Sequence, residues 1–237
     1  MCVCLQMDPS WAKYNMARVR FGLDAWVDPE DFSTVIQEQD KGVLARIGTC
    51  MVKLTGFAAD GSPASYGSGF LYTQDDNLIV TCDHVRHFSQ PQQPHEQHDV
   101  SVFKAMYPDG MEEEVQVLTP PQAVIDIMLL RGSRRAPRNM LAALPTTGDT
   151  AYVAGFPPES TSVCYSKGII GSTSHADITV DAHADNGWSG GPVVNNFGRL
   201  VGVIKRGAGA TIKRPLAISP TLLHAFLLEN HAPGLCG

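Results

Sequence analysis

The 237-residue sequence lacks any uninterrupted apolar run of the roughly 18 residues that a membrane-spanning helix needs, which argues against an integral membrane protein. Its first 26 residues are broken up by charged side chains and contain no apolar core of the kind found in secretory signal peptides. We therefore expect a cytoplasmic protein that has no membrane partner.

An excess of positive charge is also missing. The chain has 18 Lys and Arg against 24 Asp and Glu, which gives a formal net charge of −6. This balance argues against nucleic acid as the main partner, because phosphate backbones are bound by clustered Lys and Arg. The six cysteines include no Cys-x-x-Cys pair, which makes a cysteine-based zinc site weak. A disulfide framework is possible but is not favoured without a signal peptide, and we predict reduced thiols.

What the chain does contain is typical of a folded β protein. Hydrophobic residues make up 43% of the sequence, which is enough for a substantial core. The 22 glycines and 16 prolines favour many turns. The length suits one large domain or two small ones that are tightly joined.

Residues 1–41 differ in pattern from the rest of the chain. Asp8-Pro9 and Asp28-Pro29 each pair an N-cap residue with proline at the first helical position, which predicts helices over 9–20 and 29–38. This helical arm is expected either to pack on the domain or to form a surface for an oligomer or a regulatory partner.

Short β segments separated by turn residues begin at residue 42. The expected fold is all-β, with two six-stranded antiparallel barrels and a C-terminal helix over 220–230. The bounds are 42–133 for the first barrel, 134–147 for a linker and 148–237 for the second barrel with its helix. The predicted strands cover 43–54, 66–72, 78–81, 99–107, 113–118 and 124–130, and then 150–154, 163–171, 177–182, 192–194, 200–205 and 215–218.

The strongest chemical signal is Ser189, which lies within Gly187-Trp188-Ser189-Gly190-Gly191-Pro192. A serine between glycines fits a tight turn with an exposed hydroxyl, and the N–H groups of Gly187 and Ser189 can converge as an oxyanion hole. An ordinary glycine-rich turn is one alternative. The nucleophile elbow of α/β-hydrolases is another, but it needs a helix after the serine, and strands are predicted there.

His84 and Asp126 complete a candidate constellation. His84 follows a β run that starts at Leu78, and Asp126 interrupts an apolar predicted strand, where a carboxylate needs a partner. A histidine oriented by a carboxylate is what a hydroxyl nucleophile requires as its base. Each residue alone has a simpler structural explanation, and their joint occurrence favours catalysis.

Four segments in this order resemble the motifs of the chymotrypsin/trypsin-like serine protease family. They are Gly67-Ser68-Gly69-Phe70, Thr81-Cys82-Asp83-His84-Val85, Asp126-Ile127-Met128-Leu129-Leu130 and the segment around Ser189. Gly155-Phe156-Pro157 is more similar to the bacterial, Do-like (HtrA-like) branch, although too few residues follow 218 for the PDZ domain of that branch. The resemblance implies a serine endopeptidase with its site in the cleft between the barrels, with a protein or peptide substrate and no cofactor.

The sequence departs from the family pattern beside both reactive residues. Trp188 stands where members activated by cleavage have an acid that pairs with the new N-terminus, so that route of activation is not expected. Asp83 precedes His84, where it would either perturb the base or face solvent. The competing hypothesis for function is a non-catalytic protease-fold scaffold or binding module.

The resemblance also implies a specificity pocket. His183 lies six positions before the nucleophile, and Ala184 and Ile204 are expected beside it, which favours small or medium apolar side chains over Arg or Lys. His84, His87, His95 and His98 have spacings that zinc sites use, but no metal site is expected, because His84 already serves the constellation.

Overall fold

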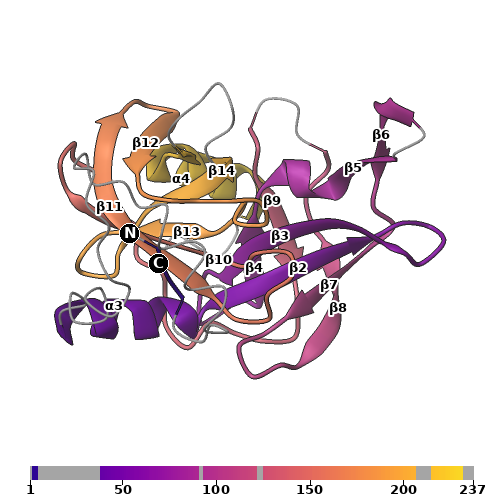
Figure 1. The fold of residues 1–237 in the computed structure, drawn as a ribbon, viewed down its shortest axis with the longest axis horizontal. Helices are drawn as coiled ribbons and strands as arrows, with labels where there is room; N and C mark the ends of the chain where they lie inside the picture. Colours follow the sequence, from indigo (N-terminus) through magenta and orange to yellow (C-terminus); the bar gives the residue numbers. More distant parts are fainter. Residues whose placement is uncertain (1, 5–37, 91–92, 122–124, 207–214, 232–237) are drawn as a thin grey trace, which may run out of the picture.

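Two β-barrels lie side by side, each built from one half of the chain (Figure 1). This computed structural model describes residues 2–4, 38–90, 93–121, 125–206 and 215–231. In that part of the chain, no helix is long and apolar enough to cross a membrane. The expected all-β fold with two six-stranded antiparallel barrels is confirmed.

The first barrel is closed, with the strand order β2-β3-β4-β9-β8-β7. Its strands bury apolar side chains inward, and all four residues of β4 are buried. Because the barrel closes on itself, it has no free edge for another chain to pair with. The strands are β2 (Met51–Phe57), β3 (Pro63–Leu71), β4 (Leu78–Thr81), β7 (Val102–Met106), β8 (Glu112–Val117) and β9 (Met128–Arg131).

The second barrel has the order β11-β10-β13-β14-β15-β12 and closes through the pairing of β11 with β12. A further strand, β1 (Cys2–Cys4), adds to β11 from outside the ring. The ring strands are β10 (Thr150–Gly155), β11 (Cys164–Thr173), β12 (Asp177–Asp181), β13 (Pro192–Val194), β14 (Leu200–Arg206) and β15 (Leu216–Ile218).

The helices and a hairpin lie outside the two rings. Helix α3 (Glu38–Gly48) precedes the first barrel. Helix α4 (Pro220–His231) follows the second barrel and confirms the helix expected over 220–230. A 3₁₀ turn, η1 (Asp83–Arg86), follows β4 and leads into the hairpin of β5 (His87–Gln90) and β6 (Gln93–Asp99). This hairpin was not predicted, because its glutamines and prolines are typical of a loop.

Two predicted strands need correction. Residues 43–48 belong to α3, where Val43, Leu44 and Ile47 are buried at the i, i+1, i+4 spacing of one helical face. The run was predicted as a strand because a short apolar segment satisfies both periods. In the predicted strand 124–130, only β9 is a strand, and Asp126 lies in the turn before it. The predicted helix at 9–20 lies outside the described residues, as do all but the last residue of the helix predicted at 29–38.

The cysteines also differ from expectation. Cys50 and Cys82 are free and buried, as predicted for thiols, but Cys164 is disulfide-bonded. The prediction of reduced thiols is therefore wrong for Cys164. The absence of Cys-x-x-Cys spacing gave no sign of it, because a disulfide joins residues that are close in space rather than in sequence.

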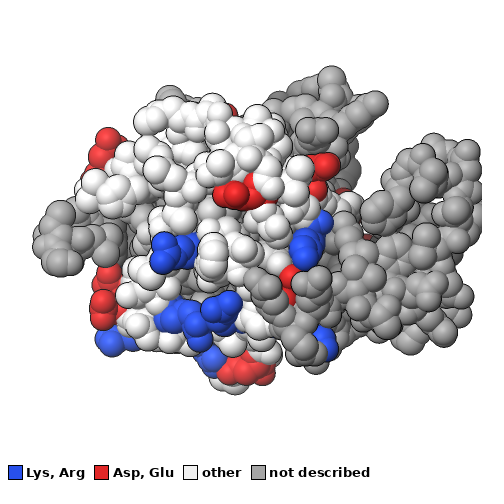
Figure 2. Space-filling model, turned by 90° about the vertical axis from the view of Figure 1, so that its left-hand side faces the viewer, with Lys and Arg blue, Asp and Glu red and all other residues white. Residues whose placement is uncertain are grey.

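Charge is distributed unevenly over the face shown in Figure 2. Lys and Arg form a small group there and otherwise lie apart, with Asp and Glu between them and wide uncharged areas. Over its described residues, this face therefore carries no continuous positive stripe of the kind that follows a phosphate backbone.

Candidate active site

His84 is positioned by the end of a buried strand. β4 ends at Thr81, and Cys82 continues in extended conformation before the chain turns into η1. Val85 faces inward against Gly67 of β3, which turns the neighbouring His84 outward. The His84 side chain is 44% exposed, so a substrate can reach its ring.

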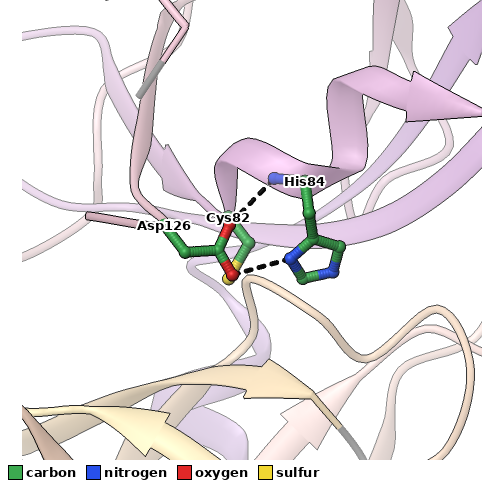
Figure 3. Close-up of side chains that lie close together, drawn as sticks. All are labelled: Cys82, His84 and Asp126. Carbon is green, nitrogen blue, oxygen red and sulfur yellow. Dashed lines mark hydrogen bonds and ion pairs between the residues drawn. The ribbon is translucent and has the colours of Figure 1, made fainter. Parts of the chain in front are cut away.

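Asp126 holds His84 at two points (Figure 3). Its Oδ2 lies 2.8 Å from His84 Nδ1, and its Oδ1 accepts a hydrogen bond of 2.8 Å from the His84 backbone N–H. A hydrogen bond of 2.8 Å from the Ile127 N–H to the Ile125 carbonyl forms a tight three-residue turn around Asp126 and directs its side chain. Because a carboxylate only accepts, Nδ1 carries the proton, and Nε2 keeps a lone pair for a substrate proton.

A neutral thiol lies beneath this pair. Cys82 Sγ donates a hydrogen bond of 3.0 Å to the Ile204 carbonyl, across the boundary between the barrels. Complete burial raises the pKa of the Cys82 thiol well above its ordinary value, and the nearby Asp126 carboxylate raises it further. Cys82, His84 and Asp126 place ligand atoms within 4.8 Å of one another, but a metal would need the thiolate, which this environment disfavours.

The loop that carries Ser189 depends on two glycines. Gly187 has a φ of +82° and Gly190 a φ of +86°, both in the left-handed region that favours glycine. A side chain at Gly190 would collide with the Ser68 carbonyl and with Thr81, and one at Gly187 would meet the Phe156 carbonyl. The glycine pattern that identified this loop therefore has both conformational and steric causes.

The loop leaves two backbone donors unused. Trp188 N–H donates to the Asp185 carbonyl at 3.1 Å, and Gly190 N–H donates to the Ile204 carbonyl at 2.7 Å. The N–H groups of Gly187 and Ser189 donate to no acceptor among the described residues. These are the two donors predicted for the oxyanion hole, and they remain available to a ligand oxygen.

Ser189 lies where the second barrel contacts the first. The Ser68 N–H donates to the Ser189 carbonyl at 2.8 Å, and Gly190 packs against the backbone of Cys82, two residues before His84. In this part of the described chain, no hydrogen bond joins the Ser189 hydroxyl to the His84 ring. Such bonds are often long without substrate and tighten when it binds.

Trp188 occupies the position beside the nucleophile as a core residue. It is 1% exposed, packs on Gly155 of β10 and meets the His183 ring edge-on, with 6.0 Å between ring centroids. The loop is therefore anchored on this side by apolar packing in the second barrel.

The three predicted pocket residues differ in their exposure to solvent. His183 is exposed, and its backbone N–H donates to Ser166 Oγ at 2.7 Å. Ala184 and Ile204 are buried in the core cluster of the second barrel. Their place in the substrate pocket stays a prediction.

Comparison with known families decides the relationship. Residues 67–203 match the family described as "Trypsin-like peptidase domain". The matched segment is more than half of the chain and includes His84, Asp126 and Ser189. The chain belongs to the trypsin-like peptidase family. No curated protein matches it.

Among solved structures, this trypsin-like peptidase resembles the serine endoprotease from Yersinia pestis, with a TM-score of 0.65 and 21% sequence identity. The likeness covers 80% of this chain and 65% of the Yersinia chain, so the peptidase spans less than two thirds of that protein. At this identity, the match establishes the shared fold.

Two structural features of the candidate site were not predicted. Asp83 is buried and pairs with Arg86 at 2.6 Å, so its charge is compensated rather than directed at His84 or at solvent. Arg86 also donates to the Thr119 carbonyl at 3.2 Å, which ties η1 to the segment that leads to Asp126. The i, i+3 spacing of Asp83 and Arg86 was the one available sequence signal.

Proposed function

We propose that this trypsin-like peptidase is a serine endopeptidase that hydrolyses peptide bonds through an acyl-enzyme on Ser189. The observation that carries the proposal is the two-point contact between His84 and Asp126. It orients an exposed imidazole with Nε2 free to accept a proton, which is the role of the base in a Ser-His-Asp triad. The unused N–H groups of Gly187 and Ser189 supply the matching electrostatic site.

The reaction follows from these groups. Ser189 Oγ attacks the carbonyl carbon of the scissile bond while His84 Nε2 takes the hydroxyl proton. The carbonyl oxygen becomes an oxyanion that the N–H groups of Gly187 and Ser189 stabilise. His84 then gives its proton to the leaving amine, and a water molecule attacks the ester by the same route in reverse. None of these steps requires a cofactor.

Labelling with a fluorophosphonate tests the proposal directly. We expect one adduct on Ser189, and no adduct in Ser189→Ala or His84→Ala, because the serine reacts only when a base removes its proton. Hydrolysis of a peptide substrate should fall by about 10⁶ in kcat for either variant. Ser172→Ala, which alters an exposed serine on β11, is the matched control and should label normally.

The second candidate is a non-catalytic binding module on the same fold. The absence of a hydrogen bond between Ser189 and His84 favours it, because a scaffold needs no contact between them. The labelling experiment separates the two hypotheses: an intact wild-type protein that takes up no probe and cleaves no peptide would establish the scaffold and exclude the enzyme.

A further inference from the structure

Ser68 is a fully buried polar residue on β3, in the glycine-flanked motif of the first barrel. Its hydroxyl donates to the Gly187 carbonyl at 2.7 Å and accepts from the Phe156 N–H at 2.8 Å. Its backbone N–H donates to the Ser189 carbonyl at 2.8 Å. Its carbonyl accepts from Thr81 Oγ1 at 2.7 Å. Every polar group of Ser68 is therefore paired.

These bonds connect the two barrels at the nucleophile loop. Three of the four partners, Gly187, Ser189 and Phe156, belong to the second barrel, whereas Ser68 and Thr81 belong to the first. Two of these three contacts are to carbonyls, those of Gly187 and Ser189, one on either side of Trp188. The peptide unit that carries the Ser189 N–H lies between these two carbonyls, so both of its neighbours are held by Ser68.

The loop around Ser189 could adopt another backbone conformation at Gly187 if Ser68 did not hold it. Gly187 has positive φ, and glycine populates both signs of φ with similar ease, so a rotation of the peptide units around it has little intrinsic cost. Such a rotation would turn a donor N–H away from the oxyanion position. The hydrogen bond from Ser68 Oγ to the Gly187 carbonyl opposes it.

We infer that Ser68 is a positioning residue that holds the oxyanion donors and the nucleophile in their reactive geometry. The inference rests on the proposed function. A serine suits this task because one hydroxyl both donates and accepts, which satisfies a carbonyl and an N–H together. Replacing it with alanine leaves both groups buried without a partner, a condition that favours rearrangement of the loop.

The expected consequence of Ser68→Ala is a loss in kcat with little change in KM. Removing an oxyanion donor outright costs about 10²–10³ in kcat. Ser68 does not contact the oxyanion but holds the residues that donate to it, so we expect a smaller fall in kcat, of about 10- to 100-fold. Affinity for a peptide boronate, which forms a tetrahedral adduct, should fall by a similar factor, because that adduct needs the oxyanion donors and ground-state binding does not.

Ser65→Ala is the matched control. Ser65 lies on the same strand and is also buried, but its hydroxyl has no hydrogen-bond partner among the described residues. Its removal should leave kcat, KM and boronate affinity unchanged. Ser68→Cys, which keeps a weaker donor of similar shape, should retain intermediate activity and serves if Ser68→Ala does not fold.

Hydrogen exchange at the Phe156 amide gives a readout that does not depend on catalysis. Its N–H is protected by Ser68 Oγ, so exchange should accelerate in Ser68→Ala and not in Ser65→Ala. A wild-type protein without activity would refute the proposed function, and the exchange rates would still report on the network. Activity and boronate affinity in Ser68→Ala equal to those of Ser65→Ala, or unchanged exchange at Phe156, would overturn the inference.

Discussion

Asp126→Asn should nearly abolish peptide hydrolysis while the fold stays intact. The asparagine carbonyl can still accept from the His84 backbone N–H, but its NH₂ group then faces His84 Nδ1, where Asp126 Oδ2 now lies at 2.8 Å. An NH₂ group donates, so Nδ1 must accept and the ring proton moves to Nε2. That tautomer cannot take the Ser189 proton, and the same change in a serine protease with this triad lowers kcat by about 10⁴.

The assay is kcat and KM for one fluorogenic peptide, together with the melting temperature of each variant. Asp99→Asn is the matched control, because Asp99 pairs with His87 Nδ1 at 2.7 Å in the same way but takes no part in the proposed reaction. It should leave kcat within about two-fold of wild type, because a side-chain pair this exposed contributes little. Activity of Asp126→Asn above a few per cent would refute the role of the carboxylate in setting the tautomer.

Three further predictions concern activation, cross-linking and specificity. The 237-residue chain should be active without cleavage, because Trp188 is buried and leaves no acid beside Ser189 for a new N-terminus. Intact mass of the active species checks this, and activity that arises only after processing near residues 40–42 would contradict it. Reduction should lower the melting temperature, since losing a native disulfide typically costs about 2–5 kcal/mol of the free energy of unfolding. The Cys164→Ser variant should have the same melting temperature with and without reductant. Equal thermal unfolding curves for the reduced and oxidised wild type would count against a disulfide bond at Cys164. Cleavage should be fastest after small or medium apolar residues, because exposed His183 offers no carboxylate to a basic side chain; a peptide panel that varies only the residue before the cut tests it, and a preference for Arg or Lys would exclude this role for His183.

Most of the candidate site could be predicted from the sequence, because each of its residues lies in a recognisable local sequence pattern. The glycines around Ser189 indicate a turn with positive φ, and the structure has that conformation at Gly187 and Gly190. His84 follows an apolar run that is a buried strand. Asp126 was identified as a carboxylate that needs a partner, and the structure places it on His84, although in a turn rather than in a strand.

The sequence by itself determined the two barrels and most of their strands, because alternation of side chains and the residues that make turns act over a few positions. Only the tertiary structure decided which distant groups meet. The bond from Ser68 to Gly187 joins residues 119 positions apart, and that from Cys82 to Ile204 spans 122. The burial of Ile204 and the disulfide bond of Cys164 also depend on the tertiary structure. A hydroxyl or a thiol has the same local pattern whatever its partner, so the partner depends on how the two closed barrels pack together.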